Sequence, residues 1–354
     1  MNYTIAAPAT AADVKDDLLR LMQSNFPWGH QADLWYRWGY EQTPYRPNVC
    51  WLVETEAHER VGFTSLMPRR MKVGETVCDV GQAANLNVAA EHRNALAAIK
   101  LQRAVVSHVD QSEMALAFGI TRNAVAVLCR AGYRDLGGFS RWIKFFRTEH
   151  KLSRWIPWGG LRRAVASVVD LGLRLRATET YQRLPAGWQV LVDPPFDERY
   201  DELWQAASTH FAVATERTSE YLQWRFGRDP QQEYRTLAVQ DSEGRLRGSV
   251  IYLFPEPEVT VPMGVIVDLL AADTIALQVL LAALCRKLRQ EGAVGIQMMY
   301  FGSPLIESGL RRFQFFRRES EYRVLAYLHP NHRDRQAELL APSCWHVTEA
   351  EAKF

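Results

Sequence analysis

The sequence has few of the features that mark specialised classes of protein. Its five cysteines are widely spaced and form no CxxC pair, which argues against a disulfide framework and against the usual zinc sites. The nine histidines are dispersed, so we predict no metal. The 42 basic and 40 acidic residues give a net charge of +2, which provides no general attraction for nucleic acid.

Long hydrophobic runs are also lacking. No run approaches the ~20 apolar residues that a membrane span needs, and the first 17 residues do not read as a signal peptide. We therefore expect a cytoplasmic protein. The 354 residues, 47% of them hydrophobic, are enough for about two globular domains with real cores.

Hydrophobic spacing and helix-ending residues predict a mixed α/β fold. The predicted order is helices over 11–24 and 31–40, strands over 49–54, 60–70, 71–80 and 82–89, a helix over 95–109, a strand over 114–119, a helix over 124–131 closed by Gly132, and a strand over 138–147. The same order recurs more loosely in the second half, where a long amphipathic helix is expected over 274–290. We infer two tandem domains, 1–147 and 186–354, each a mostly antiparallel central sheet flanked by helices.

The connector between them, 148–185, is basic. Segment 147–176 holds seven basic residues against two acidic ones, together with Trp155 and Trp158. One interpretation is a helix that lies on an anionic membrane surface. The other, which the sequence favours, is an inter-domain helix whose apolar stripe is packed and whose arginines are solvated.

A candidate anion site follows the fourth predicted strand. That strand leads through residues 89–92 directly into a helix, whose first backbone N–H groups are unpaired and point one way. A pyrophosphate suits such a site. Small side chains at the start of the helix would let a phosphate approach the backbone: Asn94, Ala95, Ala97 and Ala98.

At these residues the chain resembles the GNAT acyltransferase superfamily, over roughly 17–147 and more weakly in the second half. Arg93 and Ala98 match the first and last positions of the family's phosphate loop, Arg/Gln-x-x-Gly-x-Gly/Ala. Leu96 stands in place of the middle glycine, where a side chain would crowd the pyrophosphate of coenzyme A. Residues 118–133 are similar to the family's next strand and helix, with Leu128 where many members have a tyrosine general acid.

The resemblance implies a thioester donor, either acyl-coenzyme A such as acetyl-CoA or the phosphopantetheine of an acyl-carrier protein. The altered loop favours the carrier protein, which lacks the pyrophosphate. A backbone N–H near 86–88 would hold the thioester carbonyl. The cofactor-binding residues implied are Leu86, Asn87, Val88, Arg93, Asn94, Ala95, Leu96, Ala97, Ala98 and Asn123.

The acceptor side is less defined. Trp35, Tyr36 and Trp38 lie on the helix that roofs the acceptor site in this fold, although core packing is the alternative for them. Asn85 shares a sheet face with Asn87 and is a further substrate-binding candidate. The candidates for the base that removes the ammonium proton are Asp79, Glu91 and His92, each of which could equally be a surface residue.

The second domain is expected to be degenerate, because 271–273 offers no phosphate loop and the carboxylate of Asp273 would repel phosphate. Segments 219–226 and 344–348 resemble two-domain GNAT proteins found beside polysaccharide genes.

We expect an N-acyltransferase whose acceptor is an amine on a sugar, an amino acid or a metabolite intermediate. The alternatives are an inactive GNAT-like scaffold or sensor and an aminoacyl-tRNA-dependent transferase, against which the near-neutral charge argues.

Overall fold

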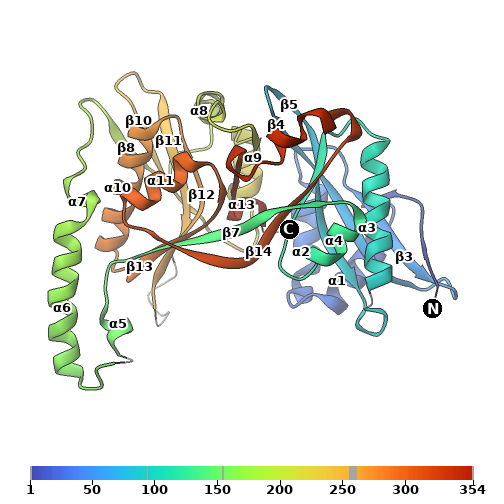
Figure 1. The fold of residues 1–354 in the computed structure, drawn as a ribbon, viewed down its shortest axis with the longest axis horizontal. Coiled ribbons are helices and arrows are strands. Elements are labelled where there is room, and N and C mark those ends of the chain that lie inside the picture. Colours follow the sequence, from blue (N-terminus) through green and yellow to red (C-terminus); the bar gives the residue numbers. More distant parts are fainter. Residues whose placement is uncertain (1, 94, 154, 255–260, 353–354) are drawn as a thin grey trace.

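Strands from both halves of the chain join into one mixed sheet, and helices lie against it (Figure 1). The computed structural model describes residues 2–93, 95–153, 155–254 and 261–352. The mixed sheet with helices against it confirms the predicted α/β class.

The first half begins with helices and continues as a long meander. Its elements are β1 (Tyr3–Ile5), β2 (Ala9–Thr10), α1 (Lys15–Asn25), η1 (Gly29–Gln31), α2 (Ala32–Tyr36), η2 (Arg37–Glu41), β3 (Val49–Thr55), β4 (Arg60–Val73), β5 (Thr76–Val88), η3 (Ala90–His92), α3 (Ala95–Asp110), β6 (Leu116–Thr121), α4 (Val125–Ala131) and β7 (Arg134–Phe145). The three strands expected over 60–89 are two, β4 and β5, which form one long hairpin. Gly74, with φ of +68°, makes the turn between them.

The connector and the second half follow. They contain α5 (Glu149–Leu152), α6 (Gly159–Arg176), α7 (Thr178–Tyr181), β8 (Gln189–Val192), α8 (Glu198–Ser208), β9 (Val213–Thr215), α9 (Ser219–Leu222), η4 (Gln223–Gly227), β10 (Arg235–Gln240), β11 (Leu246–Leu253), β12 (Met263–Ala271), α10 (Thr274–Gln290), β13 (Gly295–Gly302), α11 (Pro304–Arg312), β14 (Phe316–Leu328), η5 (Pro330–Arg335), α12 (Gln336–Leu339), η6 (Pro342–Cys344), β15 (Trp345–Thr348) and α13 (Glu349–Ala352). Asp273 caps α10, because its carboxylate accepts a hydrogen bond from the backbone N–H of Ala276.

The last strands of the two halves exchange places. The strand order is β3-β4-β5-β6-β14-β7-β13-β12-β11-β10, so that β14 pairs with β6 of the first half and β7 pairs with β13 of the second. In Figure 1, β7 and β14 run side by side across the middle of the molecule. Short strands β9 and β15 also link β13 back to β4.

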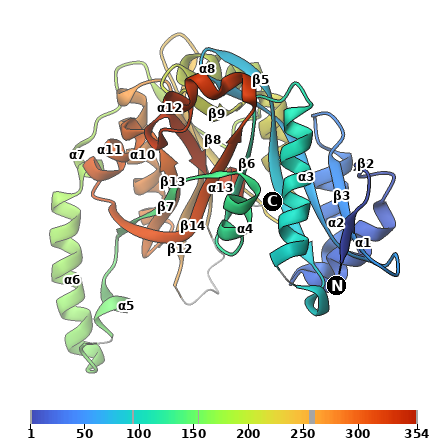
Figure 2. The same cartoon turned by 45° about the vertical axis from the view of Figure 1, so that its right-hand side comes forward.

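Helix α3 illustrates how the sequence positions these elements. Ala97, Leu101, Val105 and Val109 recur every four residues, and all four are completely buried against the first-half sheet. Gly132, with φ of +114°, ends α4 in the left-handed conformation that glycine favours. These two helices begin at the same end of β5 and β6, as Figure 2 shows.

A pair of tryptophans joins the two halves at the centre. Trp38 in η2 and Trp224 in η4 are stacked at 5.4 Å, and each indole N–H donates to the other residue's carbonyl oxygen, at 3.0 and 2.9 Å. Both elements are single π-helical turns that directly follow a short α-helix. The contact between η2 and η4 is therefore reciprocal, with the same bond made in both directions.

Helix α6 stands at the edge of the molecule in both ribbon views (Figures 1 and 2). The expectation that its apolar stripe is packed between domains is wrong. Ala166 is the one side chain of this helix that is buried, whereas Leu161, Val168 and Leu175 are 51%, 73% and 57% exposed.

Candidate functional site

A gap opens in the sheet between β5 and β6. These strands are parallel and pair at Gly81 with Ala117 and at Gln82 with Phe118, after which no further pairs form. Beyond that point a pocket of about 320 Å³ lies between them. It is lined by Phe26, Trp28, Ala83, Ala84, Asn85, Leu86, Gln102, Gly119, Ile120, Thr121, Asn123, Ala124 and Leu128.

A β-bulge in β5 shapes one wall of this pocket. Asn85 and Leu86 together lie opposite the single residue Thr64 of β4, because the register shifts there. Asn85 has φ of +56°, which is uncommon for a residue other than glycine. The bulge interrupts the ladder with β4 at the stretch of β5 that has also lost its pairs with β6, so this stretch borders the opening.

The Asn85 side chain is held from behind. Its amide nitrogen donates to the Tyr40 hydroxyl at 2.9 Å, and that hydroxyl lies 2.6 Å from the Ser65 hydroxyl. Burial raises the pKa of Tyr40, and burial also raises the pKa of the neighbouring Cys50 to about 12. The Tyr40 hydroxyl and the Cys50 thiol are therefore neutral, and the hydrogen bond from Asn85 to Tyr40 holds the bulge in place.

Gln102 and Leu128 form the far wall from the helix side. The Gln102 amide nitrogen donates to the Thr64 hydroxyl at 2.9 Å, while its buried amide oxygen has no partner among the described residues. Leu128 is buried at the position where the resemblance leads one to expect a tyrosine, so this part of the wall is apolar. Gly119 lies between Leu128 and Ala83, and a Cβ added there would lie 3.1 Å from the Leu128 side chain and 3.8 Å from the Ala83 Cβ.

The predicted cofactor residues fall into three groups. Leu86 and Asn123 line the pocket. Asn87, Val88 and Ala97 are buried. At the start of α3, Arg93 is exposed, Leu96 is 49% exposed and Ala98 is partly buried, while Ala95 opens the helix and Asn94 lies outside the described residues.

The predicted aromatic residues stand behind the pocket. Tyr36 and Trp38 are buried, and the Tyr36 hydroxyl donates to the Ala11 carbonyl. Trp35 packs on Trp28, which in turn stacks on Phe26 at 4.4 Å. Phe26 and Trp28 are the aromatics that line the pocket. The sequence analysis missed them, although the Pro27-Trp28-Gly29 helix break marks the place.

The three predicted base candidates lie outside the pocket lining. Asp79 is on the paired stretch of β5, with a carboxylate 3.3 Å from the Arg46 guanidinium. Glu91 is exposed in η3. His92 is adjacent to it and lies with Nδ1 3.4 Å from the Tyr3 hydroxyl.

The equivalent gap in the second half is filled by the chain itself. Strands β12 and β13 are parallel and pair from Met263 with Gly295 to Ile266 with Met298. Beyond this point β15 pairs with β13 over Tyr300–Gly302. In this half β15 and α13 therefore pack where the first half has its pocket, and Val267, Gln297 and Met299 of β12 and β13 line a different pocket, described below.

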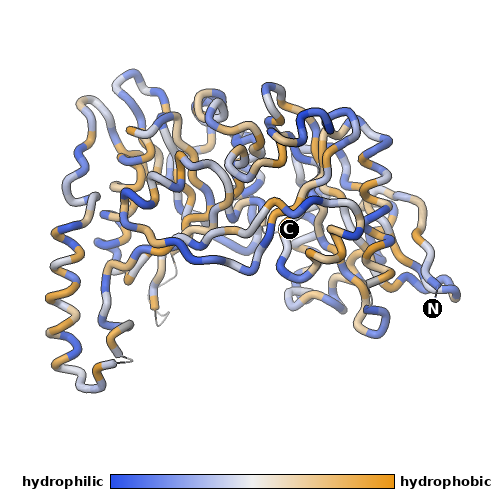
Figure 3. The backbone as a smooth tube through the Cα atoms, viewed as in Figure 1, coloured by the Kyte–Doolittle hydropathy of each residue, from blue (hydrophilic) through white to orange (hydrophobic). Residues whose placement is uncertain are grey.

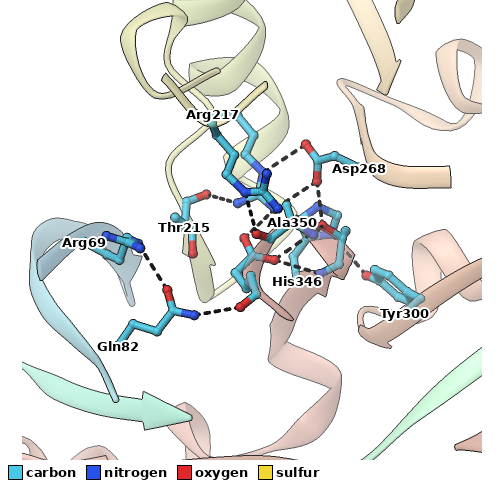
Figure 4. Close-up of polar contacts among 11 residues, drawn as sticks. Arg69, Gln82, Thr215, Arg217, Asp268, Tyr300, His346 and Ala350 are labelled. Carbon is cyan, nitrogen blue, oxygen red and sulfur yellow. Dashed lines mark hydrogen bonds and ion pairs between the residues drawn. The ribbon is translucent and has the colours of Figure 1, made fainter. Parts of the chain in front are cut away.

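A buried ionic network fixes that filling segment (Figure 4). The Arg217 guanidinium lies 3.0 Å from Asp268 of β12 and 2.7 Å from Glu351 of α13, and the Thr348 hydroxyl donates to Asp268 at 2.8 Å. Burial opposes ionisation of Asp268, but the Arg217 charge holds the pKa of this carboxyl below its usual range. The network thus holds β15 and α13 against β12.

Helix α13 lies between the first-half gap and a second cavity. The Gln82 amide donates to the Glu351 carbonyl at 2.7 Å, directly beside Ala83 of the first pocket, and Arg225 donates to the Ala350 carbonyl at 2.9 Å. On its other side is a pocket of about 440 Å³. Its lining is Phe139, Arg141, Arg225, Gln232, Tyr234, Leu253, Val267, Gln297, Met299, Tyr322, Glu349 and Ala352.

Glu349 is the carboxylate of this central pocket. Burial raises its pKa, against the opposing charges of Arg225 and Arg141. It forms no ion pair with the described residues. The sequence analysis missed Glu349, because no local motif connects it to a site built largely from other elements.

Comparison with known proteins bears on the fold. No protein-family model matches the chain, and no curated protein matches its sequence. Among solved structures, it is similar to a GCN5-related N-acetyltransferase from Anabaena variabilis (TM-score 0.64, 12% identity, 92% of this chain and 73% of the other). It is also similar to a probable N-acyltransferase from Enterococcus faecalis (0.62, 11%, 93% and 72%).

A third similar structure is the N-myristoyltransferase of Saccharomyces cerevisiae with bound myristoyl-CoA (0.53, 12%, 92% and 82%). Each likeness extends over both halves of the chain. The chain therefore has the fold of the GCN5-related acyltransferases that its sequence resembles.

Proposed function

We propose that the protein is an N-acyltransferase that binds an acyl-coenzyme A in the gap between β5 and β6. The observation that supports this best is the contrast between the two halves: β5 and β12 are both bulged at the gap, but the first gap holds an open pocket, whereas β15 and α13 pack into the second. A pantetheine arm is extended and carries amide groups, so it suits an opening edged by unpaired backbone.

The two halves are, in this proposal, tandem copies of one GNAT-like unit, 1–147 and 186–354, with the second copy unable to bind a donor. The strand order supports it, because it runs symmetrically outward from the central β14–β7 pair. The matching positions of Trp38 and Trp224 support it as well.

Donor binding is tested by filling the gap. Ala83→Phe would place a ring between the strands, because the Ala83 side chain faces Gly119 across the opening. We expect calorimetry to show affinity for acetyl-CoA or a longer acyl-CoA weakened by a factor of about 10 or more. Val77→Phe, on the exposed and paired end of the same strand, is the matched control and should bind like the parent.

The same titration separates the donors. Coenzyme A and pantetheine share the arm that enters the gap, but only coenzyme A brings phosphates to Arg93 and the start of α3. Tighter binding of coenzyme A than of pantetheine supports a coenzyme A donor. Equal weak binding, together with binding of an acyl-carrier protein, would instead favour the carrier protein, as Leu96 suggests.

The acceptor in this proposal is an amine bound in the central pocket, with Glu349 as the base. In this proposal the acyl end of the donor reaches past α13 from the gap into the central pocket. There the Glu349 carboxylate takes the ammonium proton, the free amine attacks the thioester carbon, and the carbon–sulfur bond breaks to release the thiol. A carboxylate whose pKa is raised by burial is a stronger base than an exposed one. The pocket is lined by both polar and aromatic residues, which suit an acceptor such as a small zwitterion or an amino sugar.

Glu349→Gln tests this role. A panel of amino acids, amino sugars and short peptides is assayed for thiol release from acyl-CoA. With an accepted amine, we expect kcat to fall about 100-fold with little change in KM, and the acidic limb of the pH–rate profile to disappear. Glu243→Gln, in an exposed turn, is the control. Donor binding without turnover of any amine would instead indicate a scaffold or sensor.

A further inference from the structure

Helix α6 presents an apolar face to solvent, opposite to the side by which it attaches. Ala166 is buried, and Asp170, one turn later, accepts hydrogen bonds at 2.8 Å from the backbone and the hydroxyl of Thr148. These residues mark the attached side. Val168 lies two residues from each of them, which on a helix is the opposite side.

The outward face is a continuous stripe. Leu161, Val168 and Leu175 recur every seven residues, and Leu171 lies at the edge of this stripe, where it also lines the hollow between α6 and α10. These four side chains are 51%, 73%, 57% and 57% exposed. Hydrophobic residues recur along the whole helix in Figure 3. A stripe of this length on a protruding helix marks an interaction surface, since soluble proteins rarely expose one.

Charge decides which partner this surface fits. Segment 147–176 has seven basic residues and two acidic ones. Both acids are engaged: Asp170 faces Thr148, and Glu149 lies 3.7 and 3.5 Å from the guanidinium groups of Arg162 and Arg163. The exposed Arg174 and Arg176 have no ion pair with the described residues. A second copy of the helix would bring like charges together, whereas an anionic lipid surface would neutralise them.

Two tryptophans stand where the helix begins. Trp155 and Trp158 are 80% and 71% exposed, although indole rings are usually at least partly buried. Tryptophan is the residue that gathers at the level of lipid headgroups. The combination of an outward apolar stripe, flanking arginines and exposed indoles is that of a helix lying in the plane of a membrane surface.

We propose that the segment from Trp155 to Arg176 docks the protein on anionic phospholipid membranes, with the stripe of α6 inserted at the headgroup level. This surface is separate from both pockets, so the proposal is independent of the acyl-transfer function. It concerns attachment to one membrane face and not crossing: none of the helices in the described residues is long and apolar enough to span a bilayer.

The test is co-sedimentation of the full chain with vesicles of phosphatidylcholine alone and with about 30 mol% phosphatidylserine. We expect binding to the anionic vesicles at least roughly tenfold tighter than to the neutral ones, and weaker binding at high salt. Val168→Gln combined with Leu171→Gln should abolish it, because glutamine keeps the helix but removes the apolar face. Arg174→Gln with Arg176→Gln should reduce the preference for anionic lipid.

Ile275→Gln is the matched control, since Ile275 is an equally exposed apolar residue on α10. It should bind vesicles like the parent. The proposal is overturned if the parent does not bind anionic vesicles, or if the stripe variant binds them equally well. Light scattering that reveals a dimer, which the stripe variant dissolves, would also overturn it in favour of a second copy.

Discussion

His346 is a buried histidine held neutral by its surroundings. It stacks on Phe211 at 4.3 Å, and its Nδ1 lies 3.2 Å from the Tyr300 hydroxyl. Burial, aided by the nearby Arg217 charge, lowers its pKa to about 3. In the unfolded chain histidine titrates near pH 6.5.

This difference predicts acid sensitivity. Between about pH 6.5 and about pH 3 the unfolded chain binds one more proton at His346 than the folded chain, so the free energy of unfolding falls as the pH falls, by about 1.4 kcal/mol per unit. In urea unfolding, His346→Asn should lower stability near neutrality and flatten this slope. His58→Asn, at a 90% exposed side chain, should leave the slope unchanged. Equal slopes in all three proteins would contradict the assignment.

The roles of some single residues can be predicted from their neighbours in the sequence, and the roles of others cannot. Asp273 and Gly132 have local meaning, a helix cap and a helix end, and their neighbours in the chain reveal it. The Asp273 carboxylate caps α10 and also pairs with Arg247, while the expected repulsion of phosphate stays a prediction. Burial raises the pKa of Glu349 against the opposing charges of Arg225 and Arg141, and this environment comes from distant elements that no sequence window contains.

The reciprocal hydrogen bonds between η2 and η4 are expected to stabilise the contact between the two halves of the chain. Trp38→Phe and Trp224→Phe each remove one indole donor to a buried carbonyl, so each should lower the free energy of unfolding by about 1–3 kcal/mol. Because the two residues are in contact and bond each other reciprocally, the double variant should cost less than the two single losses combined. Trp158→Phe, at an exposed ring, is the control. Strictly additive losses would mean that the pair does not couple the two halves.

Elements with a strong local period were predictable, and short ones were not. The helix expected over 274–290 has the same bounds as α10, because its apolar face and both of its ends are determined by residues within or next to the helix. Strands β9 and β15 have three and four residues, and they exist because β4 and β13 offer them partners. The same holds for the pocket. Its strands were predicted, but Phe26 and Trp28, which lie at the end of a helix and in the break after it, were not predicted to line it.

At the scale of the whole molecule, the strand exchange predicts one cooperative unfolding transition. The sheet of the first half is incomplete without β14, and that of the second is incomplete without β7. We expect tryptophan fluorescence and circular dichroism to report coincident urea transitions. Residues 1–147 and 186–354 expressed separately should be unfolded or aggregated, because β6 and β13 would have open edges. Two separable transitions, or a folded 1–147 fragment, would count against this.

The exchanged strands also bear on biosynthesis. When the ribosome has released β6, its partner β14 is still roughly 200 residues away, which at about 5–20 residues per second is a wait of roughly 10–40 s. During that interval the nascent chain displays an unsatisfied hydrogen-bonding edge beside a partly closed apolar core. Such a chain would depend on chaperones while it is translated, and a slow codon run before β14 would lower the yield of native protein.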